Sequence, residues 1–555
     1  MALRRGQKSE PIVGSDPYDD LMKQFRGNPW AVLLVVSLGF FMTLLDLTIV
    51  NIAIPNMISK LHASLDDVLW VINAYALVLA VLLITAGRLG DLLGQRRMFL
   101  AGVTVFTLAS VACGLSQGPG WLVAFRAVQG LGAALLMPQT LAMLTMVFPP
   151  ERRGAAFGVW GAVAGVATIA GPTLGGLLVT TFDWRYIFFI NLPVGVVVLI
   201  LAVILVPDLR TDQRHRFDIT GVLLASGALL AICFGLVEGQ RYDWGAVVSF
   251  ISIPLILAVG VVLLALFLWS PARKQSAEPL VPFSLFRDRN YALMNFVAGT
   301  ISIGILGIYL PFVIYLQSVL GFSALKAGLT LAPASVISMF VAPVAGRLSD
   351  RIGGKYILIT GLLCFCVGMA WLALVAQPAS AWYVFFAPQI VAGVGMGCTF
   401  APMTTVAMRN INPRMAGAAS GVFNTTRQVG SVIGTAGVGA LLQNRLFSAL
   451  TSQARQRTVG LPAATRAHLI SGFQAAARSG LEGGSGHRLT GLPGQIFSHG
   501  FVQAMRPTML APIAILLIGA ASCLLIRRGQ RAPAQPRSQT PGAPGAAEEP
   551  STALG

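Results

Sequence analysis

The chain is organised around residues 45–55, which read Leu-Asp-Leu-Thr-Ile-Val-Asn-Ile-Ala-Ile-Pro. This segment closes an apolar run that begins near Trp30, and the run is long enough for a helix to cross a bilayer, which takes roughly 20 residues. A carboxylate in such a run is costly to bury. We therefore expect Asp46 to face other helices or water with a partner, or to be protonated for part of the time. Since Asp46 is the only acidic residue that falls deep inside an apolar run, it is the candidate proton carrier.

Composition indicates a polytopic membrane protein. Of the 555 residues, 55% are hydrophobic and 11% are charged, whereas soluble domains carry about 25% charged residues. The net charge of +18 arises mainly from Lys and Arg between apolar runs, so we expect cytoplasmic loops and no nucleic-acid partner. The six cysteines lie in apolar runs without metal-ligand spacing, which predicts neither a disulfide framework nor a metal site. We also expect no cleavable signal peptide, because the first 29 residues are polar.

Apolar runs predict fourteen membrane-spanning helices, and thus an all-α fold. Helices are expected because lipid offers the backbone no hydrogen-bond partners. The predicted spans are 30–54, 68–87, 98–116, 121–147, 154–179, 186–206, 218–238, 246–269, 291–317, 324–346, 356–376, 382–408, 416–442 and 508–527.

The basic residues predict the orientation. With the N-terminus in the cytoplasm, the inner segments hold 26 Lys and Arg, and the six short outer loops hold only Lys60, Arg185, Arg241 and Lys326. Seven further arginines lie in the long connection 443–507, and long loops escape the charge rule. Both termini are therefore expected in the cytoplasm of a cell-membrane protein, with the connection 443–507 facing outward.

The chain also contains an internal repeat. Residues 87–97 (GRLGDLLGQRR) follow the second run, and residues 346–355 (GRLSDRIGGK) follow the tenth, 259 positions later. Residues 154–159 (GAAFGV) open the fifth run, and residues 417–422 (GAASGV) open the thirteenth, 263 positions later. Because the offset is eight runs, an even number, both copies keep the same direction through the membrane. Two parallel halves around a site at the midplane are a transporter architecture.

The repeat predicts five regions. They are a cytoplasmic segment 1–29, an N-terminal six-helix bundle 30–206, two inserted helices in 207–270, a C-terminal six-helix bundle 271–528 with the extracellular loop 443–507, and a disordered cytoplasmic tail 529–555. For the loop we expect a short amphipathic helix around 463–477 and a role as a surface cap, with substrate capture as the alternative.

Five motifs together resemble the major facilitator superfamily, and within it the fourteen-spanner drug:H+ antiporter-2 branch (QacA/EmrB type). The resemblance covers nearly all of residues 30–530. The motifs are the loop segment 87–97, the helix-4 segment 122–134 with Arg126, Gln129 and Gly130, the antiporter segment 161–176, the helix-1 segment 45–51 and the helix-6 entry 184–193.

The resemblance implies a cytoplasmic latch between helices that opens during transport. Asp91 has two possible partners here, because it can cap a helix N-terminus or pair with a neighbouring arginine. A basic loop without a gating role is the alternative. The residues assigned to the latch are Gly87, Arg88, Asp91, Gly94, Arg96 and Arg97 and, in the second copy, Gly346, Arg347 and Asp350.

Arg126 is the second residue assigned to proton coupling. It is permanently charged, so it can stabilise a nearby carboxylate but cannot carry the proton itself. We expect Arg126 to face a cavity near Asp46 or a substrate; the alternatives are snorkelling to an interface and binding to helix-end carbonyls. The resemblance also implies that a small-residue seam in helix 5 limits leak and favours antiport, through tight helix contact and a proline bend. The seam comprises Gly165, Gly171, Pro172, Gly175 and Gly176.

Polar residues inside the runs are candidates for the substrate cavity. Arg427 interrupts the thirteenth run, where lining the cavity and pairing across the two halves are both possible. Glu238, at the outer end of the seventh run, is expected to be solvated. The cavity candidates are Asn51, Gln129, Asn424, Arg427 and Gln428.

The function predicted from the resemblance is proton-coupled efflux of lipophilic, often cationic, toxic compounds by alternating access. The proton is the coupling ion, no cofactor is expected, and the partners are the lipid bilayer and a small-molecule substrate. We expect a monomer. No second acid lies deep in the C-terminal half, which disfavours divalent cations as substrates. The alternatives are a proton-linked exporter of one endogenous metabolite or antibiotic and, less favoured, a membrane receptor. An enzyme is disfavoured, because the sequence has no ATP-binding Gly-x-x-x-x-Gly-Lys-Ser/Thr loop.

Overall fold

The computed structural model describes residues 28–61, 63, 65–208, 218–239, 241–242, 244–269, 280–412, 415–478 and 491–527. Thirteen of the fourteen predicted spans lie on helices in this part of the chain, and the eighth is partly a hairpin. Eleven of the described helices are long and apolar enough to cross a membrane, while α10 is shorter, with 17 residues. The predicted cytoplasmic tail 529–555 and almost all of the segment 1–29 lie outside the described residues.

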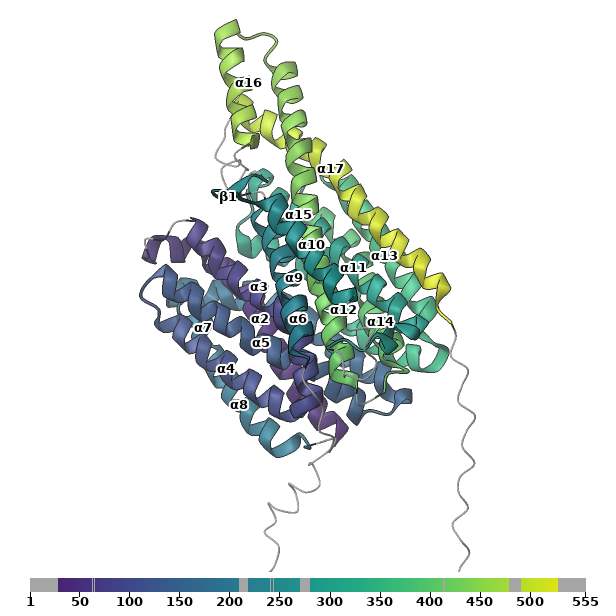
Figure 1. Ribbon diagram of the computed structural model, residues 1–555. Coiled ribbons are helices and arrows are strands. Elements are labelled where there is room, and N and C mark those ends of the chain that lie inside the picture. Colours follow the sequence, from purple (N-terminus) through teal and green to yellow (C-terminus); the bar gives the residue numbers. More distant parts are fainter. Residues whose placement is uncertain are drawn as a thin grey trace, which may run out of the picture.

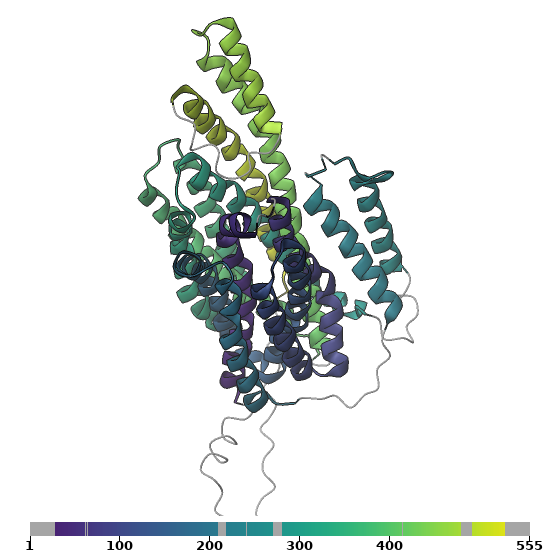
Figure 2. The same cartoon turned by 90° about the vertical axis from the view of Figure 1, so that its left-hand side faces the viewer.

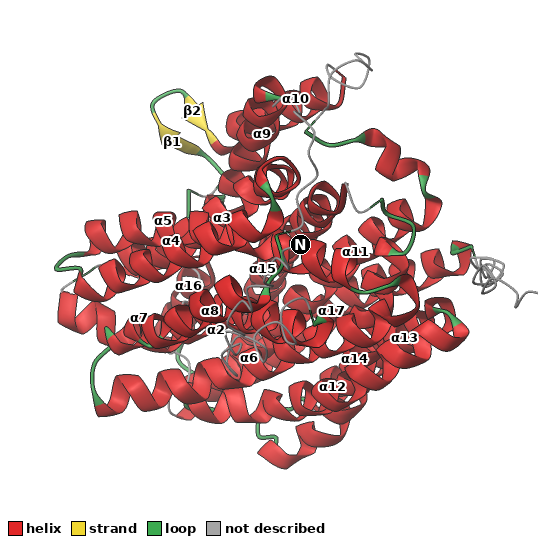
Figure 3. Cartoon of the chain, turned by 90° about the horizontal axis from the view of Figure 1, so that it is seen from below, coloured by secondary structure: helices red, strands yellow, loops and turns green. Residues whose placement is uncertain are grey.

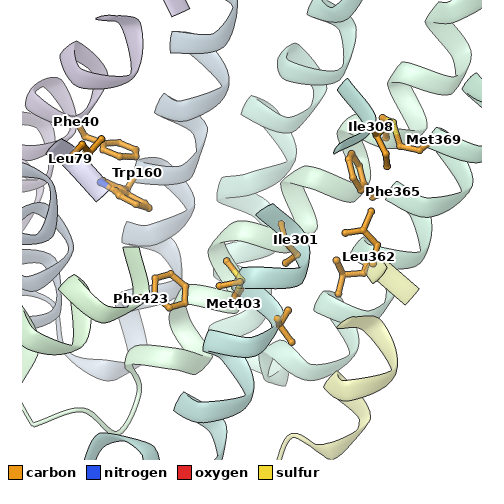
Figure 4. Close-up of a cluster of buried hydrophobic side chains, with 14 of the residues drawn as sticks. Phe40, Leu79, Trp160, Ile301, Ile308, Leu362, Phe365, Met369, Met403 and Phe423 are labelled. Atoms are coloured by element: carbon orange, nitrogen blue, oxygen red, sulfur yellow. The ribbon is translucent and has the colours of Figure 1, made fainter. Parts of the chain in front are cut away.

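The N-terminal helices form one packed group, which we call the first helix group. In it α2 packs on α6, α5 packs on both α3 and α4, and α8 packs on α4 and α2. Phe40 of α2 stacks on Trp160 of α6 with ring centroids 4.2 Å apart, as Figure 4 shows. Its helices are α2 (Pro29–Leu61), α3 (Leu65–Leu93), α4 (Gln95–Leu115), α5 (Pro119–Val147), α6 (Arg153–Thr181), α7 (Tyr186–Phe189) and α8 (Asn191–Leu205).

The C-terminal helices form the second helix group. Here α14 packs on α12 and α13, and α11 packs on α15 and α17. The short 3-10 helices Phe283–Arg287, Trp382–Phe385 and Cys523–Leu525 and the π-helical turn Tyr315–Val319 flank the longer helices. The long helices are α11 (Arg289–Ile314), α12 (Ala324–Ile352), α13 (Gly354–Val375), α14 (Phe386–Met408), α15 (Ala416–Arg457) and α17 (Gly491–Ser522).

The two groups lie side by side, with the pair formed by α9 (Ile219–Glu238) and α10 (Ile253–Trp269) at one flank (Figures 1 and 2). The groups meet mainly where α12 packs on α6 and where α15 packs on α3. The two contacts are equivalent under the repeat, because α3 and α12 are the second helices of their halves, and α6 and α15 are the fifth. The two inserted helices pack on each other, and α9 also contacts α3 and α15 across the join, as the view from below shows (Figure 3).

The predicted eighth span is only partly helical. Its first residues form a two-stranded antiparallel hairpin, β1 (Ala246–Val248) and β2 (Ile251–Ser252), and the helix begins at Ile253. β-Branched valine and isoleucine favour strands, and the turn between the strands holds Ser249 at a positive φ of 50°. The all-helical prediction was therefore wrong for this segment.

The connection 443–507 is mostly helical rather than a loop. α15 continues for 42 residues to Arg457, well past its predicted end at 442, and α17 already begins at Gly491. The predicted amphipathic helix is present as α16 (Ala463–Arg478). Figure 1 shows α16 and the adjoining end of α15 projecting beyond the rest of the molecule. Sequence reasoning ended α15 early because hydropathy falls there, although helix formation does not need apolar residues.

Candidate functional site

Asp46 lies at the centre of a buried polar cluster. Its side chain has no exposed surface, and its Oδ2 atom is 2.5 Å from Nη1 of Arg126 on α5. Gln129 donates a hydrogen bond from Nε2 to Oδ1 at 2.9 Å, and Nδ2 of Asn191 on α8 lies 3.4 Å from the same oxygen. Charge-assisted bonds of this kind stabilise an ionised carboxylate away from water.

Arg126 has several partners besides Asp46. Its Nε donates to the backbone oxygen of Val71 on α3 at 3.0 Å, and its Nη1 donates to Oε1 of Gln129 at 2.8 Å. The guanidinium carbon also lies 4.3 Å from the ring centroid of Tyr75. Four kinds of contact therefore compensate for the burial of this cation, whose side chain is 1% exposed.

A second shell of hydrogen bonds orients Asn191. Its Nδ2 donates to the Ser110 hydroxyl of α4 at 3.0 Å, and this hydroxyl donates to the backbone oxygen of Phe188 at 2.9 Å. The cluster thus ties α2, α4, α5 and α8 together around one carboxylate. Its members are buried, and all of them belong to helices of the first helix group.

The structure confirms that Arg126 lies beside Asp46, but not that it faces an open cavity. Gln129, a candidate for the substrate cavity, belongs to the same buried cluster. Sequence reasoning missed Tyr75, Ser110 and Asn191. Asn191 carried a usable signal, since it is a polar residue in an apolar run within the helix-6 entry motif.

Of the other candidate cavity residues, Asn424, Arg427 and Gln428 lie within about one turn of α15, and Asn51 lies apart from them on α2. Asn51 is exposed and bonds to the backbone oxygen of Leu47 at 3.2 Å. Asn424 is buried and donates to the backbone oxygen of Ser420 at 3.0 Å. Gln428 is partly buried, as is Arg427, whose guanidinium carbon is 5.2 Å from the Phe400 ring centroid.

Glu238 also differs from its prediction. Its side chain is 4% exposed and forms an ion pair with Arg241 at 3.2 Å, while Asn73 of α3 donates to its other oxygen at 3.4 Å. The expected solvated residue is therefore a buried contact between α9 and α3. Packing of the inserted helix against the first group removes it from water.

The two acidic residues of the repeated loops hold the groups together at one end. Asp91, at the end of α3, accepts hydrogen bonds from the backbone N–H groups of Gly417 and Ala418, at 2.8 and 2.7 Å, in the first turn of α15. Asp350, at the end of α12, accepts from Gly154 and Ala155 of α6 at 2.8 and 2.9 Å. Each carboxylate thus caps a helix of the opposite group, where the helix dipole favours negative charge. We call this end of the molecule the basic end.

Glycines permit the close approach that these caps need. The Cα of Gly87 faces the backbone of Gly417, and in the second copy Gly346 faces Gly154, so a Cβ at any of the four would overlap a backbone oxygen. Gly94 at the start of α4 adopts a positive φ of 98°, and Gly353 at the start of α13 adopts 86°. A left-handed backbone at matching places of the repeat explains why glycine occurs at both.

The arginines of the basic end differ from one another. Arg88 is buried, and Arg96 donates from Nη2 to the backbone oxygen of Val203 at 2.5 Å. Arg97 and Arg347 are exposed. Arg153, which the sequence did not single out, donates to the backbone oxygen of Met408 at 2.8 Å and so adds a contact between the groups.

The antiporter segment lies between the Asp46 helix and the second group. A Cβ at Gly171 would overlap the hydroxyl of Thr48 on α2, and a Cβ at Gly175 would lie 2.8 Å from Cγ1 of Ile49. Gly165 instead faces the backbone oxygen of Ser335 on α12. Gly176 faces open space, so it takes no part in the predicted seam, and the side chain of Pro172 lies outside the described part of the chain.

The sequence matches the Major Facilitator Superfamily over residues 36–219 and 219–435. The chain therefore belongs to this superfamily. Most of the segment 36–219 lies in the first helix group, and most of the segment 219–435 lies in the second. This is expected for a fold built from two similar halves.

Several relatives share most of the chain. It is 38% identical, over 90% of its length and 81% of the relative, to an uncharacterised MFS-type transporter of Mycobacterium tuberculosis. It is 33% identical to the tetracenomycin C resistance and export protein of Streptomyces glaucescens, covering 91% of this chain and 93% of that one. Multidrug resistance protein 3 of Bacillus subtilis is 28% identical, with coverage of 88% and 95%.

Two solved structures share the fold. The human organic anion transporter MFSD10 (TETRAN) superposes with a TM-score of 0.57 at 12% identity, covering 88% of this chain and 99% of that one. The proton:xylose symporter XylE superposes with a TM-score of 0.54 at 13% identity, covering 82% and 95%. At such identities the likeness supports the fold alone.

Proposed function

We propose that this protein exports lipophilic toxic compounds across the cytoplasmic membrane in exchange for protons, by alternating access. The observation that carries the proposal is the fully buried Asp46–Arg126 pair, a titratable group inside a membrane-spanning helix group. The names of its relatives, which include a resistance and export protein and multidrug resistance proteins, support export as the direction of transport.

The cluster suits reversible protonation of Asp46. When the carboxylate takes up a proton it loses its attraction for Arg126, and a guanidinium left without partners would be expensive in lipid. Here the cation keeps the Gln129 amide oxygen, the Val71 backbone oxygen and the Tyr75 ring. Both protonation states are therefore supported, so that the proton can enter on one side of the membrane and leave on the other.

Helix α6 provides the path from this cluster to the join between the two groups. On one side, Gly171 and Gly175 pack against Thr48 and Ile49 of α2, which are two and three residues from Asp46. On the other side, Gly165 and Gly154 pack against α12. A change in α2 that accompanies protonation would shift α6 and, with it, the contact between the groups.

The two groups are proposed to move as rigid bundles, comprising residues 30–206 and 271–528, with the helices of 207–270 inserted between them. The basic end is placed in the cytoplasm with both chain termini, following the distribution of Lys and Arg. We infer that the caps made by Asp91 and Asp350 hold that end closed, because each carboxylate binds the backbone of a helix of the opposite group. Proton entry would release them, and the membrane potential supplies about 2.3 kcal/mol per 100 mV for each charge moved.

Export of a single metabolite remains the second candidate. It is favoured by relatives whose names refer to one compound, tetracenomycin C, actinorhodin or puromycin. Growth inhibition of a host that expresses the protein, tested with several chemically unrelated dyes and antibiotics, separates the two. Resistance to one compound class indicates a dedicated exporter, and resistance to several indicates a broad one.

The proposal is tested with purified protein in liposomes that carry a pH-sensitive dye inside. We expect addition of a transported compound to cause proton movement with the native chain and with Ser59→Ala, a change to an exposed residue of the same helix. Asp46→Asn should abolish it without loss of folded protein. Undiminished proton movement with Asp46→Asn would reject this residue as the proton site.

A further inference from the structure

The position of Arg427 along α15 corresponds to a depth near the middle of the membrane. It is eleven residues from the start of α15 at Ala416, which places it about 16 Å along a helix that crosses a hydrocarbon layer of about 30 Å. One face of α15 carries Ser420, Phe423 and Arg427, and the Ser420 hydroxyl donates to the backbone oxygen of Pro138 on α5. Arg427 therefore occupies the face of α15 that is turned toward the first helix group.

The guanidinium of Arg427 lacks a charged partner among the described residues. Its Nε atom is buried without a hydrogen bond, and its nearest ring neighbour is Phe400 of α14, at 5.2 Å. Phe400 in turn faces Gly161 of α6, where a Cβ would lie 3.8 Å from the Phe400 Cβ. The guanidinium of Arg427 and the ring of Phe400 therefore lie next to each other, at the place where α14 faces α6.

The surrounding charges do not neutralise Arg427. Between residues 289 and 478 the only acidic residue of the sequence is Asp350, which is engaged at the basic end with the backbone of α6. Asp46 is engaged with Arg126 inside the first group, so that this pair adds no net charge. Among the residues that the structure describes, the positive charge of Arg427 therefore has no acidic partner.

An apolar layer lies next to this charge on the side of the basic end. Phe423 lies one turn of α15 from Arg427, toward the basic end. Met403 lies one turn of α14 from Phe400, also toward the basic end. The side chains of Phe423 and Met403 are fully buried. Figure 4 shows Phe423 beside Met403, with the stacked Phe40 and Trp160 nearby on the first group. Fully buried apolar side chains therefore lie between Arg427 and the basic end.

We propose that Arg427 and Phe400 form a substrate site that selects planar aromatic compounds carrying an acidic group, such as a carboxylate or a phenolate. An uncompensated charge in a low-dielectric site is stabilised most by a group of opposite sign, and guanidinium binds carboxylate through two parallel hydrogen bonds. Phe400 supplies a face for stacking of the aromatic part. This inference rests on the proposed export function and narrows its substrate class, since the family resemblance implied cations.

The inference has a consequence for energetics. In a one-for-one exchange, a proton entering while a monoanion leaves moves two positive charges inward, whereas exchange of a proton for a monovalent cation moves none. Export of the acidic compound should then respond to membrane potential as well as to the pH gradient. Export of a cation by the same chain should respond to the pH gradient alone.

The test uses two dyes that share one xanthene scaffold, anionic fluorescein and cationic rhodamine 123. Binding of each to the full-length protein in detergent is measured by fluorescence anisotropy, and transport of each is measured in liposomes. We expect tighter binding of fluorescein by the native chain, at least a tenfold loss with Arg427→Gln, and partial retention with Arg427→Lys. Rhodamine binding should be unchanged or improved. Arg445→Gln, an exposed change farther along α15, is the control and should alter neither dye.

The outcomes separate this inference from the function itself. If the native chain transports neither dye but binds fluorescein through Arg427, the site stands and the export proposal fails for these compounds. If both dyes bind equally, or if Arg427→Gln and Arg427→Lys lose both dyes to the same extent, Arg427 serves only the packing of α14 on α15. Either of these results overturns the inference.

Discussion

Each half of the molecule contains one arginine deep within a membrane-spanning helix, and the surroundings of these two arginines differ. Arg126, in the first helix group, is surrounded by a carboxylate, an amide oxygen, a backbone oxygen and an aromatic ring. Arg427, in the second group, has one aromatic neighbour and a buried Nε without a hydrogen bond. The first charge is balanced within the protein. Under our proposals, the second is balanced by a bound substrate, so the proton and the substrate use different sites.

The largest effect is expected from breaking the balanced pair. Arg126→Gln leaves the Asp46 carboxylate buried without its cation, which should lower the free energy of unfolding by about 3–5 kcal/mol. Thermal unfolding in detergent measures this. The double variant Asp46→Asn, Arg126→Gln leaves no unpaired charge in the cluster. It should therefore regain much of the lost free energy of unfolding, but it should not regain proton exchange. A double variant no more stable than Arg126→Gln would show that packing, rather than charge, dominates this site.

The next effect concerns the helix contact beside the balanced pair. Gly171→Val should push α6 away from Thr48 on α2, and overpacking of this kind costs about 1–3 kcal/mol. Gly176→Val, in the same helix, meets open space and is the matched control. We expect slower proton-coupled transport only with Gly171→Val. If both changes slow transport equally, a larger side chain at any position of α6 has this effect. The contact with the Asp46 helix would then have no special role in coupling.

A smaller effect is expected at the basic end, where each half contributes one carboxylate. Asp91→Asn and Asp350→Asn should each weaken a helix cap by about 1 kcal/mol, favouring the arrangement that is open at this end. A cysteine introduced at Ser420, which is fully buried between α15 and α5, should then react faster with a water-soluble thiol reagent. If only one of the two variants reacts faster, the two caps do not act as equivalent halves of a latch.

The smallest effect on stability is expected at the unbalanced charge. Arg427→Met removes no ion pair, so it should change the free energy of unfolding by less than about 1 kcal/mol. The same unfolding assay, run beside Arg126→Gln, gives the direct comparison. A loss as large as that of Arg126→Gln would mean that Arg427 is already compensated, and the contrast between the two halves would not hold.

Much of the candidate site could be predicted because its members stand out in apolar sequence. A carboxylate in the first span and an arginine in the fourth are both costly in lipid, and such groups are expected to find one another. Asn191 and Tyr75 were not identified, since a single amide or phenol in a span has many possible partners. The continuation of α15 to Arg457 was also missed, because hydropathy reports contact with lipid rather than helix formation.

The sequence by itself determined that the chain is a set of membrane helices arranged as a repeat. Long apolar runs must be helical in lipid, and two motif pairs at nearly equal offsets are difficult to obtain by chance. Only the tertiary structure decided which charges meet. Asp91 was as able to pair with an arginine of its own loop as to cap a helix, and it caps α15 of the opposite group. Arg126 and Arg427 look alike along the chain. In the described part of the chain only Arg126 has a carboxylate partner, because pairing depends on which helices lie side by side in space.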